Sequence, residues 1–572
     1  MTWRLSHALA LGAAAVVWHL AAAGLDVSRE LPAWNLAVAF GSGDLNLLFL
    51  NLTFGLAVIA GLWWTRARAP KPMDRAPNDR ALWIWAAVHL ALVIATRRGV
   101  THGMRFTDDE HAYELQARLM LEGTAAGPAL LPRWANPNDF IVYPDGELLW
   151  ASCYPLMAGL LTVPGMLIGV PNLLWSLLGA ALVLHCAKLA RQIWPATDTA
   201  AIAALLATSP VLIGLGAFKH TALPFALFAV LALRLALSPS GRRTDLGLGC
   251  VVGLAVLCRP LDGLWLVAVV TGALVATRIS MIQTLERLGW VTLGGTPLAA
   301  LLLGYNGAVT GSVLTLPYSL LYDGQPVYGF GETFYRTHTV FHALLTTVDL
   351  HLMRLNHWAL GGSIGIGIMM ASLVVARTDL RIAAVLAAWA LHVLLYAPAP
   401  YLEVSAVGLT YSLPKVVLLT LLLAGLMAHF PSVSRREIFA LAVFGWVTWV
   451  PLEAIRMHRI TQVQKAALEA PGALRPEGKL LVLHRGLSVS TYRHPVFSPP
   501  PPHSPDDRVF WVFEGDEGQF RQRAIDTWTN RDVLLLERHE RPDGPPEFRV
   551  TPWTKHQGQV PPDGSLRRHD HQ

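Results

Sequence analysis

The 572-residue sequence carries little charge. Only 15% of its residues are Asp, Glu, Lys or Arg, whereas 53% are hydrophobic and the mean hydropathy is +0.42. Because soluble domains carry roughly a quarter charged residues, the composition excludes an ordinary soluble protein. The formal net charge of +6 does not require nucleic acid, because basic loops facing the cytoplasm account for it.

The sequence is also poor in cysteine and in nucleotide-binding motifs. Cys153, Cys186, Cys250 and Cys258 lie in or beside apolar segments and form no Cys-x-x-Cys pair. We expect buried free thiols, because this spacing offers neither a disulfide framework nor a zinc site. There is no Walker-type phosphate loop and no glycine-rich dinucleotide fingerprint. Soluble activated nucleotides therefore have no visible binding site, which favours a substrate already activated on a lipid.

What the sequence has in abundance is apolar stretches of membrane-spanning length. A transmembrane helix needs about 17–25 such residues, and candidates recur between residues 8 and 453. They are 8–24, 45–64, 81–97, 173–190, 198–216, 221–237, 245–258, 261–277, 288–304, 355–376, 382–397, 413–430 and 437–452. The further apolar segment 154–170 is interrupted by Pro155, Pro164 and Gly165, so we interpret it as an interfacial or re-entrant helix.

The charge of the connectors predicts the orientation in the membrane. Basic residues gather in alternate connectors, for example between residues 278 and 287 and between 377 and 381. The positive-inside rule places these connectors in the cytoplasm. The loops 98–152 and 305–354 and the tail from residue 455 then lie on the opposite, outer side, where long polar loops usually carry binding residues.

We predict three parts: an N-terminal transmembrane hairpin (1–80), a helical transmembrane core (81–454) and an extracytoplasmic C-terminal domain (455–572). In the last part, short apolar runs predict strands, and one segment is compatible with a helix. The strands are 479–484, 508–513, 532–537 and 547–551, and the helix is 519–527. The predicted fold class is therefore an all-α polytopic membrane bundle of about 13 transmembrane helices with a small C-terminal α/β domain.

Three acidic residues, Asp108, Asp109 and Glu110, follow shortly after the candidate span 81–97. Unpaired carboxylates are costly to dehydrate, so we expect them in a watery cavity at the membrane surface. There Asp109 could act as a general base, because partial burial raises a carboxylate pKa. The alternative is an acidic helix start capped by Thr107 or Asp108. If a divalent metal takes part, Asp109 and Glu110 are its candidate ligands, although two carboxylates alone do not define a metal site.

Cationic and titratable residues stand at other span ends. Arg259 suits a lipid phosphate because a guanidinium matches phosphate geometry, and an internal pair with Asp262 explains it equally well. Lys219 and His220, between two other spans, offer a second cation and a titratable ring, or simply satisfy polar neighbours. His338 in the second outer loop is a candidate for sugar or phosphate contact, although a loop histidine is most often only solvated.

Several motifs between residues 81 and 400 carry a family resemblance. The first is Phe-Thr-Asp-Asp-Glu-His-Ala-Tyr-Glu-Leu-Gln-Ala at 106–117, followed by Glu122-Gly123. The others are Tyr143-Pro144-Asp145-Gly146, Tyr154-Pro155-Leu156, Ser209-Pro210 to His220, Arg259-Pro260-Leu261-Asp262, Tyr305-Asn306, Gly329-Phe330-Gly331 and His338-Thr339. These motifs resemble the membrane glycosyltransferases of the C-type fold, which include the protein O-mannosyltransferases and the lipid A aminoarabinose transferases.

The resemblance implies a polyprenyl-phosphate sugar donor, an outward-facing site and inversion at the anomeric carbon. It maps the family's catalytic aspartate onto Asp109, with Glu110 beside it, and it places Arg259 and Lys219 at the leaving phosphate. The remaining predicted substrate- or phosphate-binding residues are His220, His338, Tyr113 and Tyr143.

The sequence thus predicts an integral-membrane inverting glycosyltransferase that moves a hexosyl or pentosyl group from a polyprenyl phosphate to a lipid, glycan or protein acceptor. No diffusible cofactor is required, and the expected partners are the lipid donor and the bilayer, not nucleic acid. The expected location is a bacterial inner membrane, with the site facing the periplasm or exterior. The alternatives are a transporter or lipid flippase, which would place ionisable groups near the bilayer midplane, and a catalytically inactive relative.

Overall fold

The structure is a computed structural model, and it describes residues 79–553 apart from internal gaps. The gaps are 106, 137, 139, 147, 277–279, 323–324, 334–336, 348–354, 356–358, 360–363, 401–409, 431–453, 455–456, 459–460, 463, 466, 472–477, 485–506, 514–519 and 542–543. Residues 1–78 of the predicted N-terminal hairpin and the span 437–452 lie outside the described residues. The chain forms two compact units, residues 1–128 with 139–461 and residues 129–138 with 462–572, and each is described by itself.

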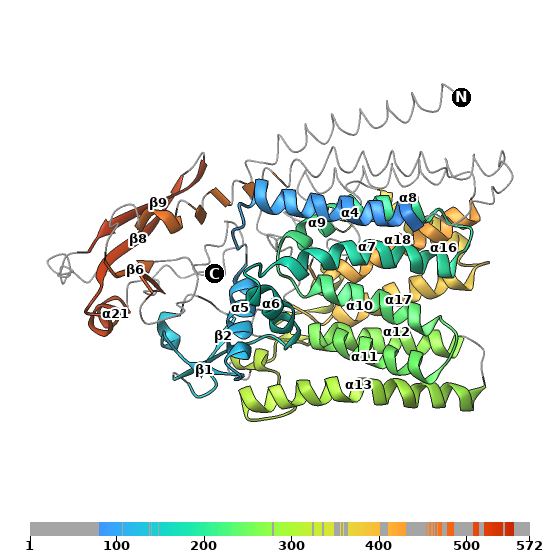
Figure 1. Ribbon diagram of the computed structural model, residues 1–572, viewed down its shortest axis with the longest axis horizontal. Helices are drawn as coiled ribbons and strands as arrows, with labels where there is room; N and C mark the ends of the chain where they lie inside the picture. The colour runs from blue at the N-terminus through green and yellow to red at the C-terminus, as the bar shows by residue number, and fades with distance from the viewer. Residues whose placement is uncertain are drawn as a thin grey trace, which may run out of the picture. The chain divides into compact units, whose positions relative to one another are not determined.

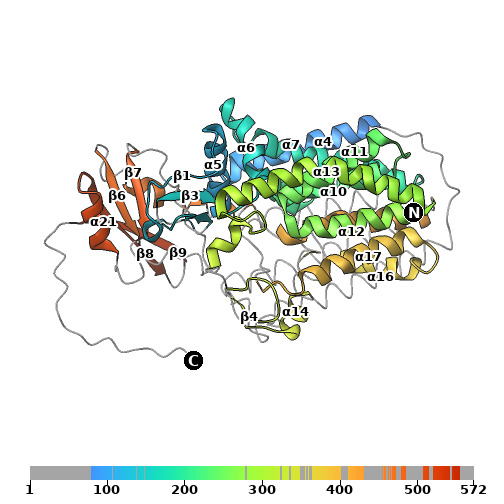
Figure 2. The ribbon, with the colours of Figure 1, turned by 90° about the horizontal axis from the view of Figure 1, so that it is seen from below.

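The first unit is a bundle of helices that lie side by side (Figure 1). They are α4 (Asp79–Ala95), α7 (Leu173–Ile193), α8 (Thr199–Ala207), α9 (Pro210–Ala217), α10 (Ala222–Ala236), α11 (Arg242–Cys258), α12 (Pro260–Ala276), α13 (Met281–Thr310), α16 (Ile364–Val375), α17 (Leu380–Tyr396) and α18 (Leu413–His429). Most predicted spans between 81 and 430 coincide with these helices. The view from below shows α12, α17 and α16 following one another across the bundle (Figure 2).

Within the described residues, three helical stretches are long and apolar enough to cross a membrane alone: Asp79–Val100, α7 and α13. The pair α8–α9 passes the same test together, bent by 56°. Pro210 explains that break, because proline has no amide hydrogen with which to continue the helix. The other apolar helices are shorter, so the total of about 13 transmembrane helices stays a prediction.

Helix α13 extends beyond both ends of the predicted span 288–304, because local sequence signals fix its ends. Ser280 accepts a hydrogen bond from the amide of Gln283 at 3.3 Å, and the Gln283 side chain accepts one from the Ser280 amide at 3.2 Å. This reciprocal pair is a capping box. At the other end Gly311 has a φ of +74°, a left-handed conformation that favours glycine after a helix.

Helices α11 and α13 approach each other at glycines. A Cβ atom added to Gly249 would lie 1.9 Å from the carbonyl oxygen of Val291, and one added to Gly294 would lie 2.2 Å from that of Leu246. Small residues at such contacts are typical of helices packed in membranes. Beside this contact the Cys250 thiol donates a hydrogen bond to the Gly294 carbonyl at 3.3 Å.

The four cysteines are free thiols, and Cys153, Cys186 and Cys258 are buried as predicted, whereas Cys250 is exposed. The prediction of a buried thiol is therefore wrong for Cys250. An apolar sequence in a membrane helix does not by itself distinguish the face that packs against protein from the face that lipid would cover, so the exposure of Cys250 could not be predicted from it.

The first outer loop folds into a helix and three short strands at one end of the bundle. Helix α5 (Asp108–Leu121) packs against α6 (Met157–Leu167), and Figure 1 shows the two side by side. The antiparallel strands β1 (Gly127–Pro128), β3 (Leu149–Ser152) and β2 (Ile141–Val142) lie in that order. With 11 residues, α6 is too short to span a bilayer core of about 30 Å alone. In the second outer loop, the strands β4 (Gly331–Glu332) and β5 (Thr337–His338) precede α14 (Val340–Thr346).

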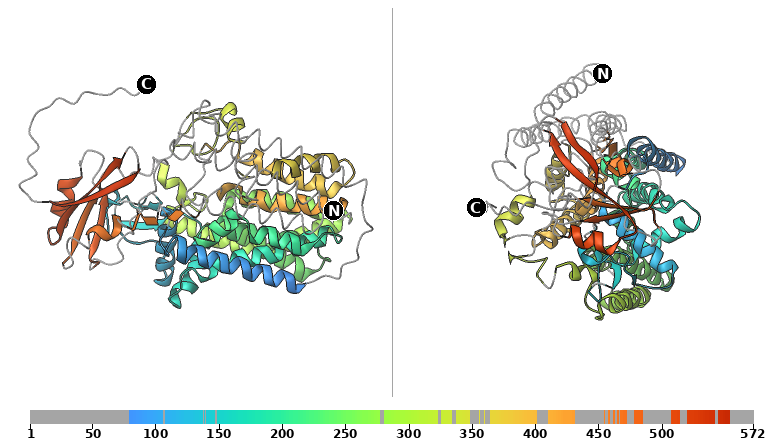
Figure 3. Two further views of the ribbon diagram at one scale, coloured as in Figure 1. Left: turned by 90° about the horizontal axis from the view of Figure 1, so that it is seen from above. Right: turned by 90° about the vertical axis from the view of Figure 1, so that its left-hand side faces the viewer.

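The second unit contains a four-stranded sheet in the order β7-β6-β8-β9, drawn in orange and red in Figure 3. The strands are β6 (Leu480–His484), β7 (Val509–Phe513), β8 (Asp532–Arg541) and β9 (Gly544–Pro552), with α21 (Arg521–Thr527) between β7 and β8. Strand β6 pairs in parallel with β7 and β8, and β9 is antiparallel to β8. The four predicted strands and the helix are confirmed.

The second unit also takes in ten residues of the first outer loop, 129–138. Within them Trp134 packs its ring 5.5 Å from Phe520 and 6.1 Å from Trp528, and the guanidinium of Arg523 lies 4.7 Å from the Trp134 ring. Aromatic contacts at such distances each contribute a modest attraction beyond the area they bury. The segment is thus held by the residues around α21.

Candidate active site

The acidic triplet forms the first turn of α5. Thr107 is the N-cap with extended backbone angles, but its side chain makes no capping hydrogen bond. Asp108 is already the first residue of the helix. The predicted cap by Asp108 is therefore wrong, and Thr107 occupies the cap position without capping. Carboxylates in this first turn still suit the partial positive charge of a helix N-terminus.

One face of α5 packs against Tyr154, which connects β3 to α6. The Tyr154 hydroxyl donates a hydrogen bond to Oδ1 of Asp109. The Tyr113 ring meets the Tyr154 ring edge to face at a centroid distance of 4.8 Å and stacks on Trp175 at 5.9 Å. The Gln116 side-chain amide donates to the Tyr154 carbonyl at 2.8 Å. Asp109 and Tyr113, predicted as site residues, are thus brought together.

The surroundings of Asp109 favour retention of its proton to a higher pH than usual. Burial raises the pKa of Asp109 above its ordinary value, and neighbouring Glu110 raises it further. The Tyr154 hydrogen bond, the Thr107 side chain and the positive charge of Arg259 oppose this by favouring the carboxylate. Asp109 nevertheless keeps part of its surface accessible, so it is open to a reaction partner.

Glu110 points elsewhere and is fully buried. Its Oε1 accepts a hydrogen bond from the backbone amide of Lys219 at 3.2 Å. Adjacent residues of a helix point about 100° apart, which explains why Asp109 and Glu110 have different partners. This separation argues against a metal held by the pair. Among the described residues, no group of three or more His, Cys, Asp or Glu side chains is placed to hold a metal ion, and metal dependence stays a prediction.

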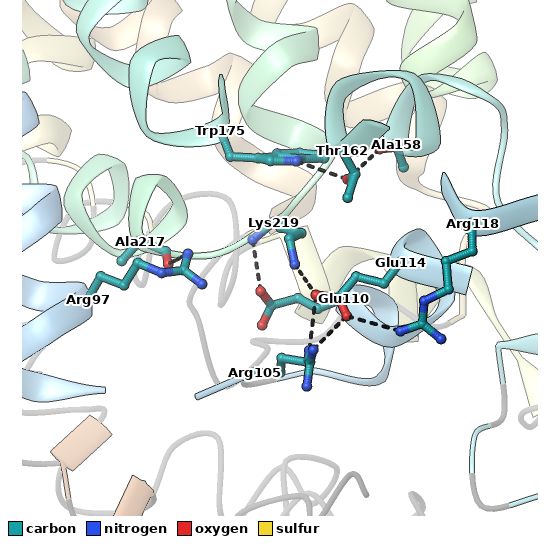
Figure 4. A network of polar contacts seen from close by, with 10 residues as sticks. All are labelled: Arg97, Arg105, Glu110, Glu114, Arg118, Ala158, Thr162, Trp175, Ala217 and Lys219. Carbon is teal, nitrogen blue, oxygen red and sulfur yellow. Dashed lines mark hydrogen bonds and ion pairs between the residues drawn. The ribbon is translucent and has the colours of Figure 1, made fainter. Parts of the chain in front are cut away.

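Lys219 is an ion-pair partner of Glu114, on the next turn of α5 (Figure 4). Its ammonium contacts Glu114 Oε1, and its side chain is only 1% exposed. Arg105 binds the same carboxylate through Nη2 at 2.7 Å and Nε at 3.0 Å, and Arg118 lies 4.0 Å from it. Burial raises the pKa of Glu114, but Lys219 and Arg105 outweigh burial and hold that pKa at about 2.

Arg259 stands between α11 and α12 and makes an internal pair with Asp262. Its guanidinium lies 4.7 Å from the Tyr411 ring, and Nη2 lies 3.4 Å from the Tyr396 hydroxyl. Asp262 in turn lies 3.0 Å from Nε2 of His392. The internal pair considered from the sequence is therefore present. A guanidinium has five N–H donors, and the pair with Asp262 uses one of them.

The remaining predicted site residues are His220, His338 and Tyr143. His220 is buried beside Lys219, and its Nδ1 accepts a hydrogen bond from the Ala222 amide at 3.1 Å. His338 is also buried, not solvated, with Nε2 at 2.8 Å from the carbonyl of Ala397. Tyr143 follows β2, in a turn where its carbonyl accepts from the Gly146 amide at 3.1 Å.

Comparison with known proteins gives matches among solved structures only. No family model matches the chain, and no curated protein matches it. ArnT from Cupriavidus metallidurans in the apo state is 14% identical, with a TM-score of 0.47 over 79% of this chain and 92% of that chain. The same protein bound to undecaprenyl phosphate gives 13% identity and a TM-score of 0.48 over 79% of this chain and 93% of that chain. The apo oligosaccharyltransferase from Archaeoglobus fulgidus is 15% identical, with a TM-score of 0.39 over 80% of this chain and 69% of that chain.

The matched proteins are C-type membrane glycosyltransferases, the family whose motifs the sequence resembles. Because the identities and TM-scores are this low, the residues of the site carry the functional proposal by themselves.

Two residues of this site were absent from the sequence-based set. Tyr154 appears there only within the motif Tyr154-Pro155-Leu156, and Glu114 only within the motif 106–117. Glu114 had a usable signal, because it lies four residues from both Glu110 and Arg118 and so shares their side of a helix. Asp109, the partner of Tyr154, lies 45 residues away in the sequence, and no local sequence pattern indicates this contact.

Proposed function

We propose that the protein is an inverting membrane glycosyltransferase in which Asp109 is the general base. The donor is a sugar on a polyprenyl phosphate, and the acceptor carries a hydroxyl or amine at the outer membrane face. The observation that carries this proposal is the state of Asp109. It is a partly accessible carboxylate with a raised pKa, held by a tyrosine hydroxyl and under the influence of a nearby guanidinium.

The proposed reaction is a single displacement. As the acceptor oxygen or nitrogen attacks the anomeric carbon, Asp109 takes up the proton that the acceptor loses. The bond between that carbon and the phosphate oxygen breaks, and the lipid phosphate leaves with the electron pair. Arg259 stabilises the charge on the departing phosphate, since its planar fork has donors beyond the pair with Asp262.

The proposal gives Lys219 a different task from the one expected. Its charge is matched by Glu114, and its backbone amide holds Glu110. We therefore assign Lys219 and Glu110 a structural role around Asp109, the proposed base. The expected sugar is a hexosyl or pentosyl group, and the expected location is a bacterial inner membrane with the site facing outward.

The donor can be identified from the purified protein. Lipids extracted from it are examined by mass spectrometry for a polyprenyl phosphate bearing a sugar, and the species found is used as the substrate. Asp109→Asn is nearly isosteric, so it should keep the fold and lipid binding while turnover falls by about a hundred- to ten-thousand-fold. Asp526→Asn, which removes an exposed carboxylate of α21, is the matched control and should keep wild-type turnover. Near-normal turnover in Asp109→Asn would refute the proposed mechanism.

A further inference from the structure

Helix α5 presents one continuous face to a single residue, Tyr154. Asp109, Tyr113 and Gln116 are spaced at i, i+4 and i+7, which places them on one side of a helix. They contact Tyr154 at its hydroxyl, its ring and its backbone carbonyl respectively. Three side chains on this face of α5 therefore hold the same tyrosine.

Tyr154 is also fixed from its other sides. Its amide donates to the Ser152 hydroxyl at 3.2 Å, and its ring lies 5.4 Å from that of Phe140 and 6.2 Å from that of Tyr318. The Gln116 side chain ties down the chain that follows, because its Oε1 accepts from the Gly159 amide at 2.9 Å. With backbone and ring both packed, the hydroxyl has one position, and that position is on Asp109.

We propose that Tyr154 is a positioning residue whose hydroxyl orients the Asp109 carboxylate, fixing Oδ1 and presenting Oδ2 to the acceptor. The role as an aid to catalysis rests on the proposed function of Asp109. The orienting contact itself depends only on the geometry around α5.

The same contact favours the charged form of Asp109 against the larger effect of burial, which raises its pKa. The groups that face Asp109 are Thr107 at the start of α5, Glu110 and Tyr113 from α5, Cys153 and Tyr154 from the β3–α6 connection, and Arg259 beyond α11. Tyr154, Thr107 and Arg259 favour the carboxylate over the acid, and Tyr154 has the largest effect of the three. A hydroxyl that donates to a carboxylate stabilises the charged form. Phenylalanine at this position keeps the ring packing and removes only the donor.

The test measures Asp109 itself and needs no substrate. The full-length protein in detergent is titrated with acid while infrared spectra record the carbonyl stretch of protonated carboxyl groups. The band that is missing in Asp109→Asn is assigned to Asp109. In Tyr154→Phe the midpoint of this band should move upward by about one to two pH units, the equivalent of a hydrogen bond to a charged group.

Tyr305→Phe is the matched control. Tyr305 is a buried tyrosine whose hydroxyl donates to the Ser152 carbonyl at 3.1 Å and accepts from Gln116 at 2.9 Å. Its loss should leave the Asp109 midpoint in place. If Tyr154→Phe does not fold, 3-fluorotyrosine at position 154 tests the same contact, because this stronger donor should move the midpoint downward. An unchanged midpoint in the folded variant would overturn the proposal.

Turnover separates this inference from the proposed function. On the donor identified above, Tyr154→Phe should lower kcat by about tenfold or more with the KM for donor lipid unchanged, because an orienting role acts on the chemical step. The acid limb of its pH–rate profile should move in the same direction as the infrared midpoint. A shifted midpoint with normal turnover in Asp109→Asn would keep the contact and reject Asp109 as the base. A shifted midpoint with normal kcat in Tyr154→Phe would reject the positioning role alone.

Discussion

Replacing Glu114 by glutamine should destabilise the protein by a predictable amount. The substitution keeps the shape of the side chain and removes its charge. It leaves the ammonium of Lys219, which is 1% exposed, without its ion-pair partner, and it weakens the anchor of Arg105. Removing one member of a buried pair is costly because the other charge stays buried.

Two routes give similar magnitudes for this cost. The pKa of Glu114 falls from 4.5 to about 2 on folding, which corresponds to about 3 kcal/mol since each pKa unit is worth about 1.4 kcal/mol. Breaking a buried ion pair typically costs about 3–5 kcal/mol. Because the folded pKa is the lower one, this contribution is fully present above pH 4.5 and is lost as the pH falls toward 2.

The assay is reversible urea unfolding in detergent, followed by the fluorescence of the 20 tryptophans. Glu114→Gln should lose about 3 kcal/mol at pH 7, and the difference from wild type should shrink below pH 4.5. Glu286→Gln, on the exposed side of α13, is the matched control and should change stability by less than about 0.5 kcal/mol. The double variant Glu114→Gln with Lys219→Met removes both charges and should recover much of the loss.

A loss below about 1 kcal/mol in Glu114→Gln, or no recovery in the double variant, would refute the reasoning. The first result would mean that the carboxylate and ammonium are solvated in the folded protein. The second would mean that Lys219 is not the group left unpaired.

Two further predictions concern topology and packing. In a Cys250→Ser background, an impermeant maleimide applied to intact cells should label Leu148→Cys and not Met281→Cys, two positions with side chains 76% and 73% exposed. Labelling of both or of neither before permeabilisation would contradict the assigned sides of the membrane. Gly249→Ala should lower the Tm because its Cβ meets the Val291 carbonyl, whereas Gly289→Ala in open space should be neutral or slightly stabilising. Equal Tm values for the two variants would contradict the close approach of α11 and α13.

Much of the helical bundle could be predicted from the sequence, because membrane helices are identified by the length and hydropathy of their apolar segments. The ends of α13 could have been placed from Ser280 and Gly311, which are strong local signals. Which face of each helix is exposed could not be predicted, because an apolar helix has no polar side to mark its outer face. Cys250 shows the result, because it lies in an apolar run and is nevertheless exposed.

The candidate site was predictable only where its residues are neighbours in sequence. The acidic triplet located the start of α5, and the family motifs selected Asp109. Tyr154, the partner of Asp109, lies 45 positions away in the sequence. Lys219, the partner of Glu114, lies 105 positions away. The family resemblance placed Lys219 at the leaving phosphate, whereas in the folded protein its ammonium pairs with Glu114. A charge near a membrane edge is therefore ambiguous until the fold shows which opposite charge it meets.

The segment 129–138 makes the C-terminal region unsuitable for simple truncation. These residues belong to the second unit, although the chain on both sides of them, through β1 and β2, belongs to the first. A fragment ending near residue 461 would keep Trp134 and discard Phe520 and Trp528, which pack against it. It would present that indole to solvent or detergent in the loop that follows α5. Loss of activity in such a fragment would then report a damaged loop and not the absence of a separate binding module, so point substitutions at Phe520 and Trp528 are the cleaner way to ask what the tail contributes.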